Sequence, residues 1–331
     1  MSSEPVVSVV ISTYNRVTRL SGAIESVLAQ ETRTPGFELI VVDNNSNDGT
    51  QAAVTSLIAL HPGRLRYAIE ARQGVAYGRN AGIAVARAPI IAFADDDVLV
   101  APNWIASIVS ALAAHPEVGY VGGKVLPCWP SSPPAWLTPD HWAPLALTDL
   151  GDIAFTVDRA NPQPLVSASL AFRRSVFEHV GQFDPSFQHQ PGSVSSVEDA
   201  ELQLRFWRAG GKGLYDPAVV AKADVQPDRL TKAYHRRWHT DHSRIAPLAY
   251  QVDEVYDRHG ALITRTGDRQ LFRIPLWAIR EALVTTAALI GARMRRREGP
   301  ALLLEGRLKE QLGWIKVRRL RQAAVNPASG R

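Results

Sequence analysis

Three short apolar runs, separated by helical patterns, constrain the fold of this chain most strongly. Residues 6–12 (VVSVVIS), 38–44 (ELIVVDN) and 89–95 (PIIAFAD) are rich in β-branched residues and almost continuously apolar. Such runs are typical of parallel strands covered on both faces. Residues 20–29 and 52–60, which lie between the runs, carry apolar side chains at helical spacing. The alternation predicts an α/β fold whose strands are joined by right-handed crossovers.

The length of 331 residues predicts about two domains, and 46% hydrophobic residues suffice for a sizeable core. The single cysteine, Cys128, excludes an internal disulfide and has no neighbours that indicate a nucleophile or a zinc site. We therefore expect a reducing compartment, the cytoplasm. The amino terminus lacks the basic region of a signal peptide. No uncharged apolar run reaches the length of about 18 residues that a membrane span needs.

Charge is distributed unevenly along the chain. Residues 265–331 hold 15 Lys and Arg against 5 Asp and Glu, a net charge of +10, so residues 1–264 carry −5 and the whole chain +5. This asymmetry predicts two parts with different partners.

Each of the three predicted strands ends in a polar segment. These segments are STYNR (12–16), DNNSNDGT (43–50) and DDD (95–97). Ligands of open α/β sheets gather outside the carboxyl ends of the strands, where all three segments would face one crevice. The pattern indicates a nucleotide-type pocket. A dinucleotide fingerprint and a P-loop are absent, because STYNR has no glycine and GVAYGRNAG (74–82) spaces its glycines by four.

Three adjacent carboxylates, Asp95, Asp96 and Asp97, need a compensating partner. They raise one another's pKa unless a cation or hydrogen-bond donors compensate, so a divalent metal ion is one explanation. A solvated turn, in which each carboxylate bonds its own backbone, is the other.

At this point the chain resembles the family-2 type of inverting glycosyltransferase, which has the GT-A fold. The matching segments occur in the family's order over roughly residues 5–230: SVVISTYNR, ESVLAQ, FELIVVDNNSNDGT, GVAYGRNAGIAVA, IIAFADDDV, ASLAFRRSVFEHVGQFD and SVEDAELQLRFWRAGG. The resemblance implies a mostly parallel central sheet flanked by helices, followed here by a C-terminal helical extension.

The resemblance also implies a site for a nucleoside-diphosphate sugar. Thr13, Asn15, Arg16 and Asp43 would contact the base and ribose, with Asp43 placed like the acid that receives the N3–H of uracil in this family. Arg79 would approach the diphosphate beside a helix N-terminus. The alternatives are an Asx turn for Asp43 and a surface cation for Arg79.

The acidic triplet would complete the donor site. By resemblance, Asp97 would hold Mg²⁺ or Mn²⁺, and Asp95 or Asp96 would contact the ribose or the metal through water. In an extended segment Asp95 and Asp97 share one face and Asp96 lies on the other, so Asp95 and Asp97 are the predicted metal pair.

Asp199 is the predicted catalytic base and Glu198 the second candidate. Inversion by direct displacement needs one base within hydrogen-bond reach of the acceptor hydroxyl. The alternative is structural, because Ser195 with Glu198 and Ser196 with Asp199 both fit a capping box.

Two segments depart from the family pattern. The family's histidine some twenty residues after the Glu-Asp pair is missing, and residues 222–224 are Lys-Ala-Asp. Asp224 could replace it as an oxygen ligand, one of His235, His239 and His242 could do so, or the triplet and phosphates could hold the metal alone. Ser167 to Ser169 replace the glycine and asparagine that the family often has near the acceptor, so substrate choice could differ.

The segment YHRRWHTDH (234–242) lacks the glutamine of processive synthases, which predicts single transfer.

Residues 128–142 and the C-terminal segment complete the pattern. The first is rich in proline and holds three tryptophans, which predicts a long loop that is either a lid or pinned to the core. Residues 272–294 carry apolar side chains spaced by three and four before the basic run RMRRRE, and residues 302–320 are similarly basic. These amphipathic helices would pack on their own domain or contact an anionic membrane. Nucleic acid is not an expected partner, because no recognition motif accompanies the basic residues.

The sequence thus predicts a GT-A domain at residues 1–245 and a basic helical extension at 246–331. Residues 1–125 would form the nucleotide-binding half and 126–245 the acceptor half. The predicted activity is metal-dependent, inverting transfer of a sugar from a UDP-linked donor to a hydroxyl of a cell-envelope glycan or lipid-linked acceptor. The predicted location is the cytoplasm, including the inner membrane face. The alternatives are a sugar nucleotidyltransferase and a non-catalytic membrane-docking protein.

Overall fold

The computed structural model describes residues 4–30, 36–251, 254–257, 259–264, 267–272 and 274–325. Contacts divide the chain into two compact units. Unit 1 comprises Met1–Trp129, Ala146–Gln188 and Glu198–Val225, and unit 2 comprises Pro130–Leu145, His189–Val197 and Gln226–Arg331. The predicted domain boundary after residue 245 stays a prediction.

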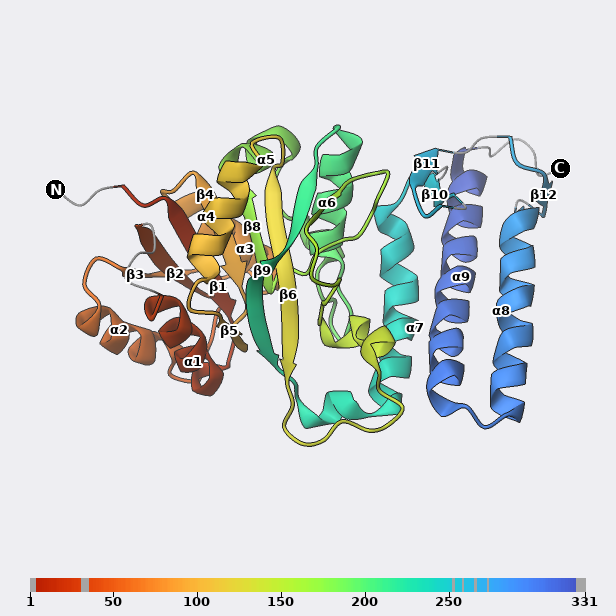
Figure 1. Ribbon diagram of the computed structural model, residues 1–331, viewed down its shortest axis with the longest axis horizontal. Coiled ribbons are helices and arrows are strands. Elements are labelled where there is room, and N and C mark those ends of the chain that lie inside the picture. Colours follow the sequence, from red (N-terminus) through yellow and green to blue (C-terminus); the bar gives the residue numbers. More distant parts are fainter. Residues whose placement is uncertain are drawn as a thin grey trace. The chain divides into compact units, whose positions relative to one another are not determined.

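Unit 1 is built around a sheet whose described strands have the order β3-β2-β1-β4-β8-β6-β9-β5, with β7 paired to β9 (Figure 1). Strands β3, β2, β1 and β4 run parallel, β8 is antiparallel to both β4 and β6, β6 and β9 are parallel, and β5 and β7 join β9 antiparallel. The bounds are β1 Val7–Thr13, β2 Phe37–Asp43, β3 Leu65–Ile69, β4 Ile90–Ala94, β5 Val98–Val100, β6 Tyr120–Cys128, β7 Phe155–Val157, β8 Ser169–Arg173 and β9 Gly213–Asp224.

Helices flank this sheet (Figure 1). They are α1 Val17–Leu28, α2 Thr50–Leu60, α3 Val75–Val85, α4 Trp104–Ala114, α5 Arg174–Val180 and α6 Glu198–Arg208, with the short 3-10 helix η3 Pro185–Phe187 before α6. The helices predicted at residues 20–29 and 52–60 are α1 and α2. The predicted α/β architecture with a mostly parallel sheet is confirmed.

Burial explains why the first strands read as continuous apolar runs. Every residue of β2 and β4 is buried, because helices cover both faces of the sheet. Glu38 and Asp43 are the charged exceptions within β2, and Glu38 lies near its start. The Glu38 carboxylate accepts hydrogen bonds from Ser8 Oγ (2.7 Å) and Arg66 Nη1 (2.7 Å), which satisfy a charge that is only 4% exposed.

The glycines spaced by four serve helix packing. Gly78 and Gly82 lie on the face of α3 that packs on β1. A Cβ on Gly78 would overlap Ser12 Oγ, and one on Gly82 would overlap the side chain of Val10. The missing side chains therefore let α3 approach the strand closely.

Unit 2 contains three long helices, and α9 lies between α7 and α8 (Figure 1). Their bounds are α7 Lys232–Ala249, α8 Leu276–Met294 and α9 Glu298–Val325. The shorter elements are the 3-10 helices η1 Pro139–His141, η2 Ala143–Leu145 and η4 Pro227–Leu230, and the strand pairs β10 Glu254–Tyr256 with β11 Leu262–Thr264 and β12 Gln270–Leu271 with β13 Ile274–Pro275.

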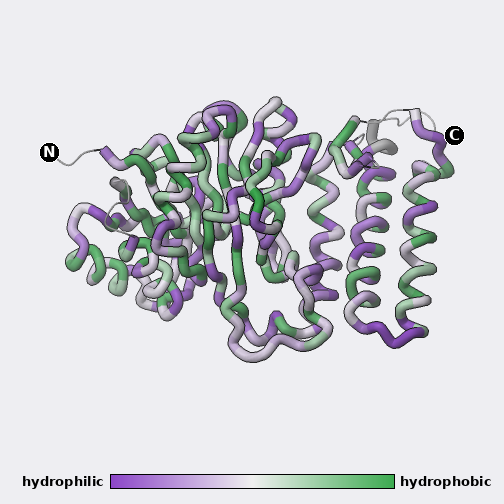
Figure 2. The backbone as a smooth tube through the Cα atoms, viewed as in Figure 1, coloured by the Kyte–Doolittle hydropathy of each residue, from purple (hydrophilic) through white to green (hydrophobic). Residues whose placement is uncertain are grey.

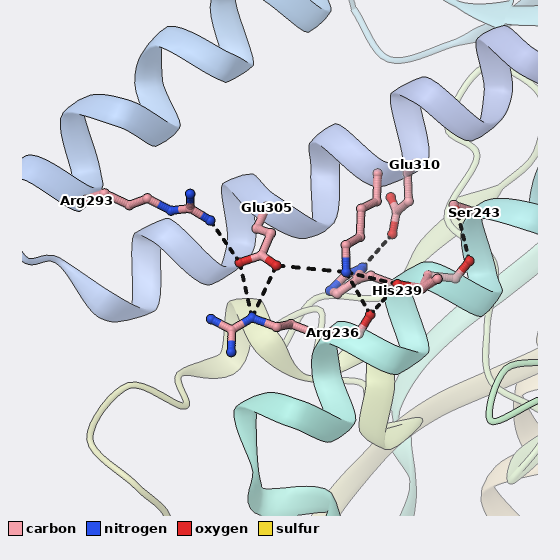
Figure 3. Close-up of polar contacts among 8 residues, drawn as sticks. Arg236, His239, Ser243, Arg293, Glu305 and Glu310 are labelled. Carbon is pink, nitrogen blue, oxygen red and sulfur yellow. Dashed lines mark hydrogen bonds and ion pairs between the residues drawn. The ribbon is translucent and has the colours of Figure 1, made fainter.

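Polar contacts join α7 to α9 (Figure 3). Arg236 Nε lies 3.2 Å from Glu305 Oε1, and His239 Nδ1 lies 2.8 Å from Glu310 Oε1. Gly306 and Gly313 face His239 and Ser243, which would overlap a Cβ at either glycine. Helix α9 is thus anchored to α7 by the Arg236–Glu305 ion pair, by the His239–Glu310 hydrogen bond and by close helix packing.

The proline-rich segment is a loop, as predicted, with the short helix η1 near its end and η2 directly after it. Trp136 stacks edge-on against His141 (5.6 Å between ring centroids) and His235 (5.0 Å) within unit 2. This tryptophan is therefore pinned by neighbouring rings.

The predicted C-terminal helix begins at Leu276, four residues later than the apolar pattern, because Phe272 occupies the turn between β12 and β13 with a φ of 52°. Purple and green alternate along α7, α8 and α9 in Figure 2. No described helix combines the length and apolarity of a membrane span.

Candidate functional site

The acidic triplet lies in a turn between β4 and β5. Arg16 Nη1 lies 2.8 Å from Asp96 Oδ1 and 3.1 Å from Asp97 Oδ2. Thr13 Oγ1 donates a hydrogen bond of 2.7 Å to Asp96 Oδ2. The loop after β1 therefore reaches two of the three carboxylates.

The predicted alternation of side chains across the triplet is wrong. Asp96 and Asp97 share the Arg16 guanidinium, whereas Asp95 Oδ1 lies 3.0 Å from Arg79 Nη2. The physical reason is local: the backbone turns here, and Val98 N donates to the carbonyl of Asp95 at 3.2 Å, so the period of two of an extended strand does not apply. The metal roles of Asp95 and Asp97 remain predictions.

Two arginines keep the like charges together. Burial raises the pKa of the Asp96 carboxyl, and the charge of Arg16 and the hydrogen bond from Thr13 offset only part of this, so the net shift is upward. Burial lowers the pKa of Arg16, but the charges of Asp96 and Asp97 raise it. The net shift is upward, so this arginine stays charged.

The end of β2 meets the end of β1 at the same rim of the sheet. Thr13 and Asp43 are register partners, and Asn44 N donates to the carbonyl of Thr13 at 2.8 Å. The Asp43 carboxylate is buried and accepts from Tyr67 Oη (2.6 Å) and Ser46 N (2.8 Å). The bond from Ser46 is local, but it comes three residues after Asp43 and not two as in an Asx turn, and the second carboxylate oxygen is bound to Tyr67.

Asn15 ties the first loop to the second. Its backbone has a φ of 51°, its N–H donates to Ser46 Oγ (3.0 Å), and its side-chain oxygen accepts from Asn47 N (2.8 Å). Left-handed backbone of this kind is tolerated best by asparagine among residues with a Cβ. Asn15 is therefore a structural link between the loops.

Arg79 joins the acidic triplet to the start of α6. Arg79 is 5% exposed, and its guanidinium lies 2.7 Å from Glu198 Oε1 and 3.0 Å from Asp95 Oδ1. Burial lowers the pKa of Arg79, but Asp95, Glu198 and Asp199 raise it, so the net shift is upward. Arg79 is thus a buried cation with two carboxylate partners, which excludes the alternative of a surface cation.

Asp199 is held differently from its neighbour Glu198. It is half-buried, and its Oδ2 accepts from Ser167 N (3.1 Å) and Ser167 Oγ (3.2 Å). Glu198 is 3% exposed and ion-paired. Helix α6 begins at Glu198, so Val197 directly precedes it. Neither Ser195 nor Ser196 therefore occupies the N-cap position that the alternative of a capping box requires.

The structure adds three residues that sequence patterns did not single out. Tyr67 donates to Asp43, Asn44 accepts from Gly74 N (2.7 Å), and Gln188 accepts from Ala76 N (3.0 Å). The last two contacts fix the start of α3. Their only sequence signal is that Asn44 follows a strand, which does not reveal a partner thirty residues away.

The candidates for a third metal ligand lie in both units. The Asp224 backbone N–H donates to the carbonyl of Asp97 at 2.9 Å, which places Asp224 beside the triplet. Its carboxylate lies 3.7 Å from Arg19 Nε. Within unit 2, His239 bonds Glu310, His242 lies 3.1 Å from Ser195 Oγ, and His235 is packed by rings. In the described part of the chain, no three His, Cys, Asp or Glu side chains form a group that could hold a metal.

Comparison with known proteins decides the family. The family model described as Glycosyl transferase family 2 matches residues 8–181, just over half of the chain. The chain belongs to this family. The resemblance seen in the ordered motifs is thereby confirmed for this family-2 chain.

Two relatives extend the comparison. An uncharacterised glycosyltransferase of Nostoc sp. is 28% identical over 258 residues, covering 78% of the chain and 73% of the relative. Validoxylamine A glucosyltransferase of Streptomyces hygroscopicus subsp. jinggangensis is 31% identical over 218 residues, covering 63% of the chain and 47% of the relative. The family-2 chain therefore spans less than half of the second relative's length.

A solved structure shows the same fold. The mannosyltransferase of Pyrobaculum calidifontis, in complex with GDP-Man and Mn²⁺, superposes with a TM-score of 0.53 at 19% identity, covering 100% of this chain and 77% of that one. The predicted GT-A fold is confirmed. The ligands named in that complex belong to that protein.

Proposed function

We propose that the chain transfers a sugar from a nucleoside-diphosphate sugar to an acceptor hydroxyl with inversion, one sugar at a time. The observation that carries the proposal is the convergence of strand-end residues: Thr13 and Asp43 end neighbouring strands, Arg16 reaches Asp96 and Asp97, and Arg79 reaches Asp95 and Glu198. Membership of family 2 supports it.

Asp199 is the proposed base. In a direct displacement the acceptor oxygen bonds to the anomeric carbon, the bond to the diphosphate oxygen breaks, and the base receives the hydroxyl proton. Asp199 fits better than Glu198, because Glu198 is buried against Arg79 while Asp199 is half-buried and held by a neutral serine. Glu198 is then a positioning residue.

A divalent metal, Mg²⁺ or Mn²⁺, is the proposed cofactor. Asp95 and Asp97 would supply carboxylate oxygens, the ligands that such hard cations prefer, and the backbone N–H of Asp224 bonds the carbonyl of Asp97. The Mn²⁺ in the mannosyltransferase complex supports this assignment. When bound, the ion would neutralise charge that develops on the departing diphosphate.

The nucleotide is proposed to contact Thr13, Asn15, Arg16, Asp43 and Asp96. Asp43 would receive an imino N–H of the base, as expected for a UDP-linked donor, once Tyr67 shares or yields one carboxylate oxygen. The positive charge of Arg79 is already neutralised by its partners Asp95 and Glu198. Arg79 would therefore act on the diphosphate indirectly, by holding these two carboxylates in place.

A cell-envelope glycan or lipid-linked molecule is the proposed acceptor, with the enzyme in the cytoplasm and at the inner membrane face. The net charge of +10 in residues 265–331 supports contact with an anionic bilayer. A sugar nucleotidyltransferase is disfavoured because the loop after β1 has no glycine.

Donor protection and turnover test the proposal together. Asp199→Asn should keep Mn²⁺-dependent protection by a UDP-sugar in thermal unfolding and lose about 10²- to 10⁴-fold in transfer or donor hydrolysis. Asp97→Ala should weaken the Mn²⁺-dependent protection itself. Glu117→Gln, which changes a carboxylate 55% exposed, is the matched control.

Full turnover by Asp199→Asn would remove Asp199 as the base. If both variants behave like wild type, the result favours the alternative of a non-catalytic membrane-docking protein. A panel of nucleotide sugars in the same assay identifies the donor base.

A further inference from the structure

Helix α8 packs along α9 with a face of three small residues and one leucine. Its buried side chains are Ala278, Thr285, Leu289 and Ala292, each less than 9% exposed. α8 is the outermost of the three long helices of unit 2 (Figure 1). Only one side of it is therefore covered by a neighbouring helix.

Several larger apolar side chains on the opposite face of α8 are exposed, whereas Trp277 and Ile279 are half-buried and Leu289 is buried. Leu283 is 66% exposed, Val284 61%, Ile290 55% and Met294 80%, and Leu276 at the start of the helix is 45% exposed. The spacing of three, four and seven residues places positions 276, 283, 287, 290 and 294 in one stripe. We call the exposed side chains at these five positions the α8 stripe. The apolar pattern seen in the sequence is thus the uncovered face of the helix.

Positive charge accompanies the stripe. Arg280 is exposed one turn after Leu276 and so lies on the same face. Arg293, Arg295, Arg296 and Arg297 follow at the end of the helix, and Glu281 is the single acid in residues 276–297. Figure 2 shows this turn after α8 as a continuous hydrophilic segment. The segment therefore carries a net charge of +4, from five arginines and one glutamate.

We propose that the α8 stripe and its arginines dock on the surface of an anionic phospholipid bilayer. Leucine, isoleucine and methionine side chains would enter the boundary between headgroups and acyl chains, while arginines at the helix end contact phosphates. Arg280 fits this arrangement, because its aliphatic stem can lie beside Leu276 and Leu283 while the guanidinium reaches a headgroup.

Charge argues against the other occupants of this face. A second copy of the chain would bring two sets of five arginines toward one interface, where like charges repel. An apolar protein groove would bury the Arg280 guanidinium without a counter-ion. An anionic bilayer supplies phosphates for Arg280, Arg295, Arg296 and Arg297, while Arg293 lies 3.4 Å from Glu305 of α9.

The contact would be peripheral, since no described helix can span a membrane. It deepens the membrane contact proposed above by assigning it to one helix face. It does not depend on the transfer reaction, so its test can fail while donor hydrolysis persists.

Vesicle flotation with the full chain tests the docking. The chain should float with vesicles of phosphatidylcholine and phosphatidylglycerol, and remain largely unbound with vesicles of phosphatidylcholine alone. The double variant Leu283→Gln with Ile290→Gln should reduce the partition coefficient about tenfold or more. Replacing Arg295, Arg296 and Arg297 with glutamine should reduce it by a similar factor and remove most of its salt dependence.

The matched control is Leu60→Gln, an apolar side chain on α2 that is 72% exposed and carries no part of the stripe. It should float like wild type. All variants should keep the wild-type melting temperature and donor hydrolysis in vesicle-free solution, because the changed side chains are exposed.

Three results would overturn the proposal. They are no flotation of wild type with anionic vesicles, equal flotation with neutral and anionic vesicles, and flotation that the double variant leaves unchanged. A wild-type dimer in sedimentation that the double variant dissociates would assign the face to a second copy instead.

Discussion

Arg79 binds two carboxylates from distant parts of the chain. Its partners Asp95 and Glu198 lie 16 and 119 residues away. Together with Arg16, it explains how three adjacent aspartates stay together at the end of a buried strand: each carboxylate of the triplet has an arginine partner. Arg79 thereby joins the strand-end rim of the sheet to the start of α6, where the proposed base lies.

The Arg79–Glu198 pair predicts a stability effect. Glu198→Gln removes the negative charge beside a buried guanidinium and leaves Asp95 as its charged partner, so the free energy of unfolding should fall by about 1–3 kcal/mol. Urea unfolding measures this. Glu117→Gln, at an exposed site, should change it by less than about 0.5 kcal/mol. Equal effects of the two substitutions would show that the buried pair adds nothing.

His235 predicts how stability depends on pH. Burial lowers the pKa of His235 to about 4, with smaller contributions from the nearby His141 and His239, and its Nε2 atom has no hydrogen-bond partner. Below the ordinary histidine pKa of about 6.5 the unfolded chain binds a proton that folded His235 does not bind. The contribution of neutral, buried His235 to the free energy of unfolding is therefore complete above about pH 6.5, and it is lost as the pH falls toward 4.

The measurement is the free energy of unfolding between about pH 7 and pH 4.5. Wild type should lose roughly 1–3 kcal/mol more than His235→Phe over this range. His115→Asn, which changes an exposed histidine, should follow the wild-type profile. Parallel profiles for wild type and His235→Phe would contradict the assignment.

At the scale of elements, close packing decides where glycine is needed. The face of α3 with Gly78 and Gly82 meets Ser12 and Val10 of β1, and this contact positions Arg79 between them along the helix. Helix α8 offers the opposite case at Gly291, where nothing would lie within 4 Å of an added Cβ.

These two glycines predict opposite effects of alanine. Gly82→Ala should destabilise the protein by about 1–3 kcal/mol, because the methyl group overlaps Val10 in the core. Gly291→Ala should stabilise it by about 0.5–1 kcal/mol through helix propensity. Thermal unfolding of both variants checks the signs. Stabilisation by Gly82→Ala would mean that α3 can move away from β1 at little cost.

At the scale of the whole molecule, the proposed donor site lies within unit 1. Every residue assigned to nucleotide, metal or base, from Thr13 to Asp199, belongs to that unit. The three histidines named as possible replacements for the missing ligand belong to unit 2. Ligand binding is therefore expected to act on one unit.

Calorimetry tests this division. We expect two unfolding transitions, one of which gains about 2.7 kcal/mol when Mn²⁺ and a nucleotide diphosphate are present at roughly 100 times their Kd. EDTA should return it to the ligand-free position, and Asp97→Ala should lack the Mn²⁺-dependent part. Equal shifts of both transitions would contradict a site confined to unit 1.

The sequence by itself determined the parallel strands, the helices α1 and α2, the proline-rich loop and the polar strand ends. These follow from local periodicity and from backbone chemistry at proline, which act over a few residues. The ordered motifs also identified the family and the GT-A fold.

Only the tertiary structure decided the partners. It showed that Asp96 and Asp97 share Arg16, that Glu198 rather than Asp199 is buried against Arg79, and that the apolar pattern of α8 faces away from α9. A local turn replaces the period of two in the triplet, and α8 buries a face of mostly small residues against α9. Such pairings depend on which parts of the chain, far apart in the sequence, come into contact. Local sequence periodicity does not determine these contacts.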